Sequence, residues 1–93
     1  EYIINTVCEH FDVSLEDIKS NKRSSKIVHP RQIAMYLCRD MTDTALKVIG
    51  KYMGNRDHTT VKHGIEKIEK ELQTSPTTQN TVEILKKKIN PQK

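Results

Sequence analysis

The apolar positions of the chain recur at helical spacing in separate segments. One stripe consists of Ile3, Ile4, Val7, Cys8 and Phe11, and a second of Ile33, Ala34, Leu37, Cys38 and Met41. Apolar residues spaced three and four apart share one face of an α-helix, whereas strands show apolar–polar alternation, which this sequence lacks. The pattern therefore predicts an all-α protein in which each stripe faces the core.

Capping signals indicate where the helices of the first half begin. Segment 14–17, Ser-Leu-Glu-Asp, has the form of a capping box, which predicts a short helix to about Ser20. Residues 21–26 are polar and basic without apolar periodicity, which indicates a loop. Proline fits the first helical turn, where its missing N–H costs no hydrogen bond, so we expect a third helix to begin at His29 and Pro30.

Three further helices are predicted in the second half. Thr42 and Thr44 are candidate N-caps of a fourth helix, which Gly54 ends. A fifth helix is expected over residues 57–73, with its apolar stripe at Val61, Ile65, Ile68 and Leu72. A polar connection then leads to a short sixth helix over residues 81–90. The sequence thus predicts a six-helix chain.

Composition limits the size of the core and the type of partner. With 93 residues, 34% of them apolar, we expect one domain over residues 1–93 with a single modest core. The net charge of +4 favours a polyanionic partner. Residues 19–39 carry six Lys or Arg and no Asp or Glu. This basic stretch is either a solvated face or a phosphate-tracking surface.

The two cysteines, Cys8 and Cys38, lie on apolar stripes and form no C-x-x-C pair. We expect both to be buried thiols rather than zinc ligands or nucleophiles, and we expect no cofactor. Free thiols without a secretory signal favour a reducing cytosol, so a cytoplasmic location is predicted. The chain does not begin with Met, which indicates a fragment of a longer protein.

A three-residue turn, Gly54-Asn55-Arg56, separates the fourth and fifth predicted helices. Two helices joined by a short Gly-containing turn predict a helix-turn-helix over about residues 44–73. In such a unit the second helix lies in the DNA major groove, and its first residues contact base edges. Short polar side chains at that position would let the positive helix end approach phosphates.

The first turn of the fifth helix offers four side chains suited to this task. Asp57 accepts hydrogen bonds and suits the exocyclic amine of cytosine or adenine. His58 can donate to a base or a phosphate, Thr59 offers a hydroxyl and a methyl group, and Thr60 can bind a phosphate. The alternative for Asp57 is an ordinary helix cap. His58 and His63 are five residues apart, which does not favour a metal site.

These residues resemble a known family. The run 56–61, Arg-Asp-His-Thr-Thr-Val, followed by His63 and Lys67-Ile68, resembles the signature of the C-terminal DNA-binding domain of the bacterial replication initiator DnaA. Residues 20–42 resemble that domain's basic loop and following helix, and the similarity covers about residues 1–90. It implies a six-helix domain with a Trp-repressor-like core that binds the AT-rich DnaA box at the replication origin.

The resemblance also implies roles for single residues. Arg23 would enter the minor groove from the loop, Arg31 and Gln32 would anchor the DNA backbone, and Arg39 would reach toward the major groove. The predicted DNA-binding set is Arg23, Lys26, Arg31, Gln32, Arg39, Arg56, Asp57, His58, Thr59, Thr60, Lys62 and His63. The chain departs from the family at His29, where Arg is common, and at Lys62, where an apolar residue is frequent.

Other functions stay open at this point. A helix-turn-helix module of a transcriptional regulator is the main alternative, followed by a protein-interaction module, and an enzyme is least favoured. The chain lacks G-x-x-x-x-G-K-[ST], so the ATPase, oligomerisation and helicase-loading functions of the full-length family would reside elsewhere. We expect the isolated domain to be monomeric, the full-length protein to oligomerise on the origin, and acidic phospholipids to contact the N-terminal helix.

Overall fold

The computed structural model describes residues 2–91, so Glu1 and residues 92–93 of the predicted domain lie outside the described residues. The all-α prediction is confirmed, since the described residues contain helices and no strand. The helices are α1 (Tyr2–Phe11), α2 (Leu15–Lys19), α3 (Ser25–Thr42), α4 (Leu46–Tyr52), α5 (His58–Thr74) and α6 (Pro76–Ile89).

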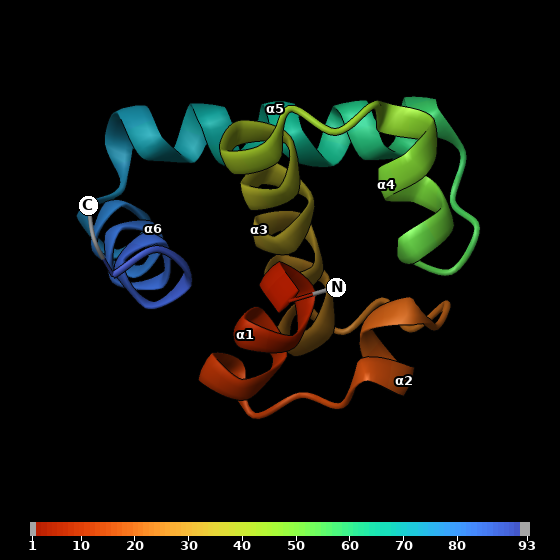
Figure 1. Cartoon of the computed structure of the whole chain (residues 1–93), viewed down its shortest axis with the longest axis horizontal. Helices are drawn as coiled ribbons and strands as arrows, with labels where there is room; N and C mark the ends of the chain where they lie inside the picture. The colour runs from red at the N-terminus through yellow and green to blue at the C-terminus, as the bar shows by residue number, and fades with distance from the viewer. Residues whose placement is uncertain (1, 92–93) are drawn as a thin grey trace.

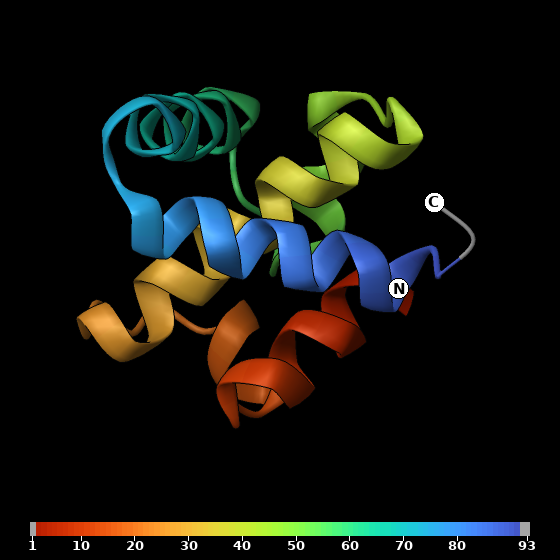
Figure 2. The same ribbon diagram turned by 90° about the vertical axis from the view of Figure 1, so that its left-hand side faces the viewer.

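Helix α3 is the centre of the arrangement and contacts each of the other five helices. Figure 1 shows α5 crossing α3, with α4 beside the start of α5 and α2 on the side of α3 away from α5. The crossing lies near the middle of α3, where Gly64 faces Gln32 and Met35. In Figure 2, α6 runs between α5 and α1, and it packs against both. The long central helix therefore fixes the relative positions of α2, α4 and α5.

The core is one cluster, to which every helix contributes buried apolar side chains. Ile4, Ile33 and Ile68 are at most 1% exposed, and each such side chain contributes roughly 1.5–3 kcal/mol relative to an exposed one. Cys8 and Cys38 are free thiols exposed by 8% and 7%, so the prediction that both are buried is confirmed. Burial raises the pKa of both thiols.

The start of α3 differs from the prediction. The helix begins at Ser25, and the hydroxyl of Ser24 accepts a hydrogen bond from the Lys26 N–H at 3.3 Å. Pro30 lies inside the helix, where it removes one backbone hydrogen bond. The additional turn buries Ile27, which is 7% exposed, and this burial favours the longer helix.

The predicted start of α6 is also wrong, because the helix begins at Pro76 rather than near residue 81. Ser75 caps it by accepting a hydrogen bond from the Thr78 N–H at 3.2 Å, and Pro76 occupies the first turn. The predicted N-caps of α4, Thr42 and Thr44, do not cap that helix. Thr42 belongs to the last turn of α3, and the N-cap of α4 is Ala45, which makes no side-chain capping bond.

Candidate nucleic-acid interface

The turn between α4 and α5 is held by close backbone contacts. Gly54 has φ +84°, and Asn55 has φ 61°, so both adopt the left-handed conformation. The Arg56 N–H donates to the Gly50 carbonyl at 2.9 Å, and a Cβ on Gly50 would lie 3.2 Å from the Arg56 carbonyl carbon. A Cβ on Gly54 would lie 3.1 Å from the Lys19 carbonyl carbon. The turn therefore packs against both α4 and the end of α2.

The first turn of α5 presents its polar side chains outward. Asp57 occupies the N-cap position, yet its side chain makes no capping hydrogen bond and is 66% exposed. Its Oδ1 lies 3.4 Å from Nδ1 of His58, and Thr59 and Thr60 are exposed. Asp57 thus occupies the N-cap position that the capping alternative predicted, but its carboxylate makes no capping hydrogen bond.

The rest of α5 separates a buried face from an exposed one. Val61, Ile65 and Ile68 are buried, whereas Lys62 and His63 are exposed. The buried face packs against α3. The exposed face therefore presents Lys62 and His63 near the start of α5, and both Lys and Glu side chains over residues 66–70.

The basic loop, defined here as residues 21–24, joins α2 to α3 and is exposed throughout. Arg23 lies in this loop, and Lys26 lies exposed in the first turn of α3. The Lys22 ammonium pairs with the Asp17 carboxylate at 2.8 Å, and this contact raises the pKa of Lys22. Arg23 and Lys26 therefore lie in positions open to a polyanion.

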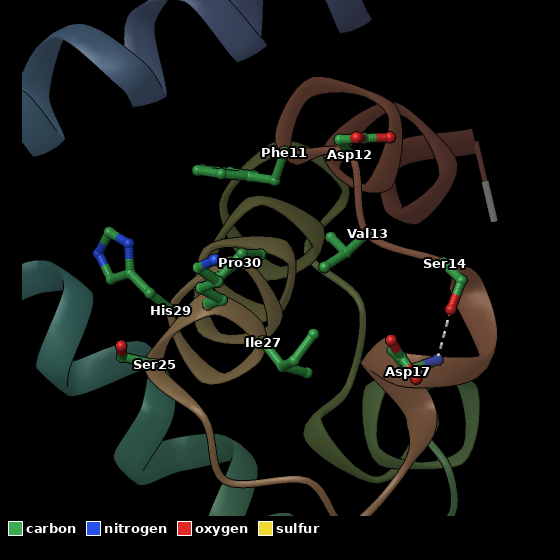
Figure 3. A pocket seen from close by; sticks show the side chains of 10 residues that line it. Phe11, Asp12, Val13, Ser14, Asp17, Ser25, Ile27, His29 and Pro30 are labelled. Carbon is green, nitrogen blue, oxygen red and sulfur yellow. Dashed lines mark hydrogen bonds between the residues drawn. The ribbon is translucent and has the colours of Figure 1, made fainter.

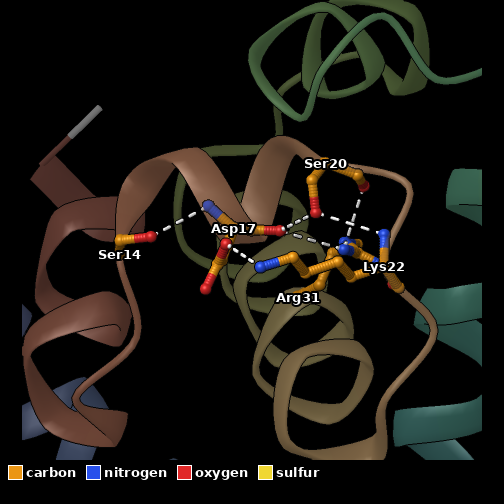
Figure 4. A network of polar contacts seen from close by, with 5 residues as sticks. All are labelled: Ser14, Asp17, Ser20, Lys22 and Arg31. Carbon is orange, nitrogen blue, oxygen red and sulfur yellow. Dashed lines mark hydrogen bonds and ion pairs between the residues drawn. The ribbon is translucent and has the colours of Figure 1, made fainter.

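Arg31 is not the surface anchor that the sequence predicted. It is 6% exposed. Its guanidinium donates four hydrogen bonds to backbone carbonyl oxygens, those of Asp17 (3.2 Å), Ile18 (2.7 Å), Ser20 (3.0 Å) and Lys22 (3.1 Å). Figure 4 shows the side chain directed at the end of α2 and the start of the basic loop. Its donors are therefore used inside the fold.

Arg56, which lies in the turn between α4 and α5, also points at the carboxyl end of α2. Its guanidinium donates to the carbonyls of Lys19, Ser20 and Met53, and the Lys19 contact measures 3.4 Å. Burial lowers the pKa of Arg56 and of Arg31, and the positive charge of Arg56 lowers that of Arg31 further. Both guanidiniums stay charged at neutral pH because of their high intrinsic pKa.

The remaining predicted residues on α3, Gln32 and Arg39, differ in their exposure. Gln32 is half-buried, and its Oε1 has no hydrogen-bond partner among the described residues. Arg39 is exposed and donates to the Thr44 carbonyl at 2.9 Å, with the Asp43 carboxylate at 3.8 Å. Arg39 therefore connects the end of α3 to the segment before α4.

An open groove lies beside the start of α3, lined by Phe11, Val13, Ile27 and Pro30 among others (Figure 3). His29 borders it, and its Nε2 lies 2.9 Å from Oε1 of Glu71 on α5. Sequence analysis missed this pair, because nothing in the local pattern links residues on different helices.

Helices α4 and α5, the tight turn and the outward polar first turn of α5 define a helix-turn-helix domain. The family described as "Bacterial dnaA protein helix-turn-helix" matches residues 1–68, which is most of the chain. The chain belongs to this bacterial DnaA family.

Individual relatives support the same family assignment. The "Chromosomal replication initiator protein DnaA" of Lachnoclostridium phytofermentans is 55% identical over 91 residues, which cover 98% of this chain and 20% of that protein. The protein of the same name from Treponema pallidum is 42% identical over 89 residues, covering 96% of this chain and 19% of that protein. The chain therefore spans about one fifth of the length of these curated relatives.

A solved structure supports the fold. The crystal structure of a "DNA replication initiation factor" superposes with a TM-score of 0.85 at 34% identity, covering 97% of this chain and 27% of that one. Among residues 2–91 of the present chain, no helix is both long and apolar enough to cross a membrane.

Proposed function

We propose that this domain binds double-stranded DNA sequence-specifically and recognises the DnaA box at the replication origin. The observation that carries the proposal is the exposed start of α5, residues 57–60. These residues directly follow the turn of the helix-turn-helix in a chain of the DnaA family. In this arrangement α5 is the recognition helix, and its first turn contacts base edges in the major groove.

The basic loop supplies a second point of contact. Arg23 is exposed, and a loop arginine can enter the narrow minor groove of AT-rich DNA, where the negative potential is strongest. Lys26, Gln32 and Arg39 flank the two contacts along α3, and we assign Lys26 to the phosphate backbone. Exposed Lys62 and His63 extend the surface along α5.

The proposal is tested by fluorescence anisotropy with a DnaA-box duplex and a scrambled duplex of equal composition. We expect much tighter binding to the box at physiological salt, because base contacts add to the sequence-independent phosphate attraction. Equal affinities for the two duplexes would refute sequence-specific recognition.

Two substitutions separate base contacts from phosphate contacts. Thr59→Ala should narrow the difference between box and scrambled DNA without changing the salt dependence, because a neutral side chain releases no counterion. Lys26→Ala should weaken both duplexes and reduce the slope of log affinity against log salt by about one unit. If Thr59→Ala weakens both duplexes equally, α5 is not the recognition helix.

The regulatory alternative is less well supported, because the relatives carry the name of a replication initiator. We propose that the domain is the DNA-recognition module of a longer initiator in the bacterial cytoplasm, whose ATPase and assembly functions reside in other parts of that protein. A monomeric state of the isolated domain, oligomerisation of the full-length protein on the origin and contact of α1 with acidic phospholipids stay predictions.

A further inference from the structure

Two arginines meet at the carboxyl end of α2, although they come from different parts of the chain. Arg31 reaches it from α3 and Arg56 from the turn before α5, and both donate to the Ser20 carbonyl. The last carbonyls of a helix have no partner within that helix, and the negative end of the helix dipole attracts cations. The short helix α2 therefore receives from two guanidiniums the hydrogen bonds that its own backbone cannot provide.

These contacts join the two elements that the proposed function places on DNA. The basic loop leaves α2 directly after Ser20, and Arg31 also holds the Lys22 carbonyl within the loop at 3.1 Å. Arg56 immediately precedes the first turn of α5. Gly54 brings the turn so close to the Lys19 carbonyl that a Cβ would not fit without a shift. The end of α2 is thus the point at which loop and turn are held together.

We propose that Arg31 and Arg56 are positioning residues for DNA recognition, which fix the basic loop relative to the first turn of α5. This inference rests on the proposed function. Arg23 and residues 57–60 must reach adjacent grooves of one duplex at the same time. A loop that is already ordered loses less conformational entropy on binding, so holding it in place increases affinity without any contact between the holding residues and DNA.

Lysine cannot replace arginine in this role. Arg31 donates from Nε, Nη1 and Nη2 to carbonyls that lie in different directions, which matches a planar fork of five donors. An ammonium group keeps the charge but presents three donors from one atom. Arg31→Lys therefore separates the two roles, because a phosphate ligand would still work as lysine and a positioning residue would not.

The test is a double-mutant cycle on the box duplex, with Arg31→Lys as the first change and Arg23→Ala as the second. We expect Arg31→Lys to weaken binding by about tenfold, a typical effect for residues that act through a shared element, with the salt slope unchanged. Arg23→Ala should then cost much less in the Arg31→Lys background than in wild type. Thr59→Ala is the matched control, and its cost should be the same in both backgrounds.

Limited trypsin cleavage after Lys22 and Arg23, followed by mass spectrometry, measures loop order without DNA. It should be several-fold faster in Arg31→Lys than in wild type, at a temperature where circular dichroism shows both folded. Arg56→Lys is carried through both experiments, and it replaces Arg31→Lys if that variant does not fold.

Three results would overturn the inference: wild-type affinity in both lysine variants, full additivity with Arg23→Ala, or unchanged cleavage of the loop. The failure of the proposed function is recognised separately, because wild type would then bind box and scrambled DNA equally.

Discussion

Gly50→Ala should destabilise the domain although it replaces glycine by the best helix former. Gly50 lies inside α4, where alanine would gain about 1 kcal/mol in helix propensity. The new Cβ, however, would lie closer than 3.0 Å to the Arg56 carbonyl oxygen and 3.2 Å from its carbon. Overpacking costs typically about 1–3 kcal/mol, and a backbone obstacle places this case at the upper end. The expected net loss in unfolding free energy is about 2 kcal/mol.

Thermal unfolding followed by circular dichroism shows whether Gly50→Ala destabilises the domain. For a domain of this size a loss of about 2 kcal/mol lowers the melting temperature by roughly 8–16 °C. Gly64→Ala is the matched control, because its Cβ would meet the flexible side chains of Met35 (Sδ at 3.0 Å) and Gln32 (Cγ at 3.3 Å) instead of backbone. Its unfolding free energy should stay within about 1 kcal/mol of wild type. A melting temperature of Gly50→Ala equal to or above wild type would refute the reasoning.

Three further predictions concern the loop, the core and pH. Arg23→Ala should lower box affinity by about 1–3 kcal/mol, measured by anisotropy, with an unchanged melting temperature because the loop is exposed. Cys8→Ala and Cys38→Ala should each cost about 1–2 kcal/mol in denaturant unfolding, through a small cavity, without weakening DNA binding. Burial raises the pKa of Glu71, but hydrogen bonds from His29 and Thr78 outweigh it, and the net pKa is below the ordinary 4.5. Its contribution to stability is therefore complete above pH 4.5 and lost as pH falls through the folded-state pKa, so Glu71→Gln should show a flatter fall of melting temperature in acid.

The helices could be predicted from the sequence better than their boundaries. Apolar stripes located the long helices, because a buried helix face repeats with the helical period, and the capping box at Ser14 located the short helix α2. The two prolines led to wrong helix boundaries, each in a different way. Pro30 was placed at a helix start and lies inside α3, whereas Pro76 was placed in a connection and begins α6. The burial of Ile27 decided the first case and the Ser75 cap the second.

The candidate site was predictable where side chains stay on the surface. Residues 57–60 are exposed at the start of a helix, as the turn and the missing apolar residues indicated. Arg31 was misassigned because its partners are backbone carbonyls from α2 and the basic loop. Every residue carries a carbonyl, so no residue type in the sequence marks such partners, and a buried arginine cannot be distinguished from an exposed one in the same basic stretch.

The packing of α1 against α6 has a consequence for how the chain acquires its structure during synthesis. The Tyr2 hydroxyl donates to the Lys88 carbonyl at 3.3 Å, across a separation of 86 residues. Helix α1 therefore lacks one of its neighbours until α6 has been synthesised. At about 5–20 residues per second, this leaves an apolar edge of α1 uncovered for several seconds. During that interval the nascent chain should be most sensitive to proteases and most dependent on chaperones.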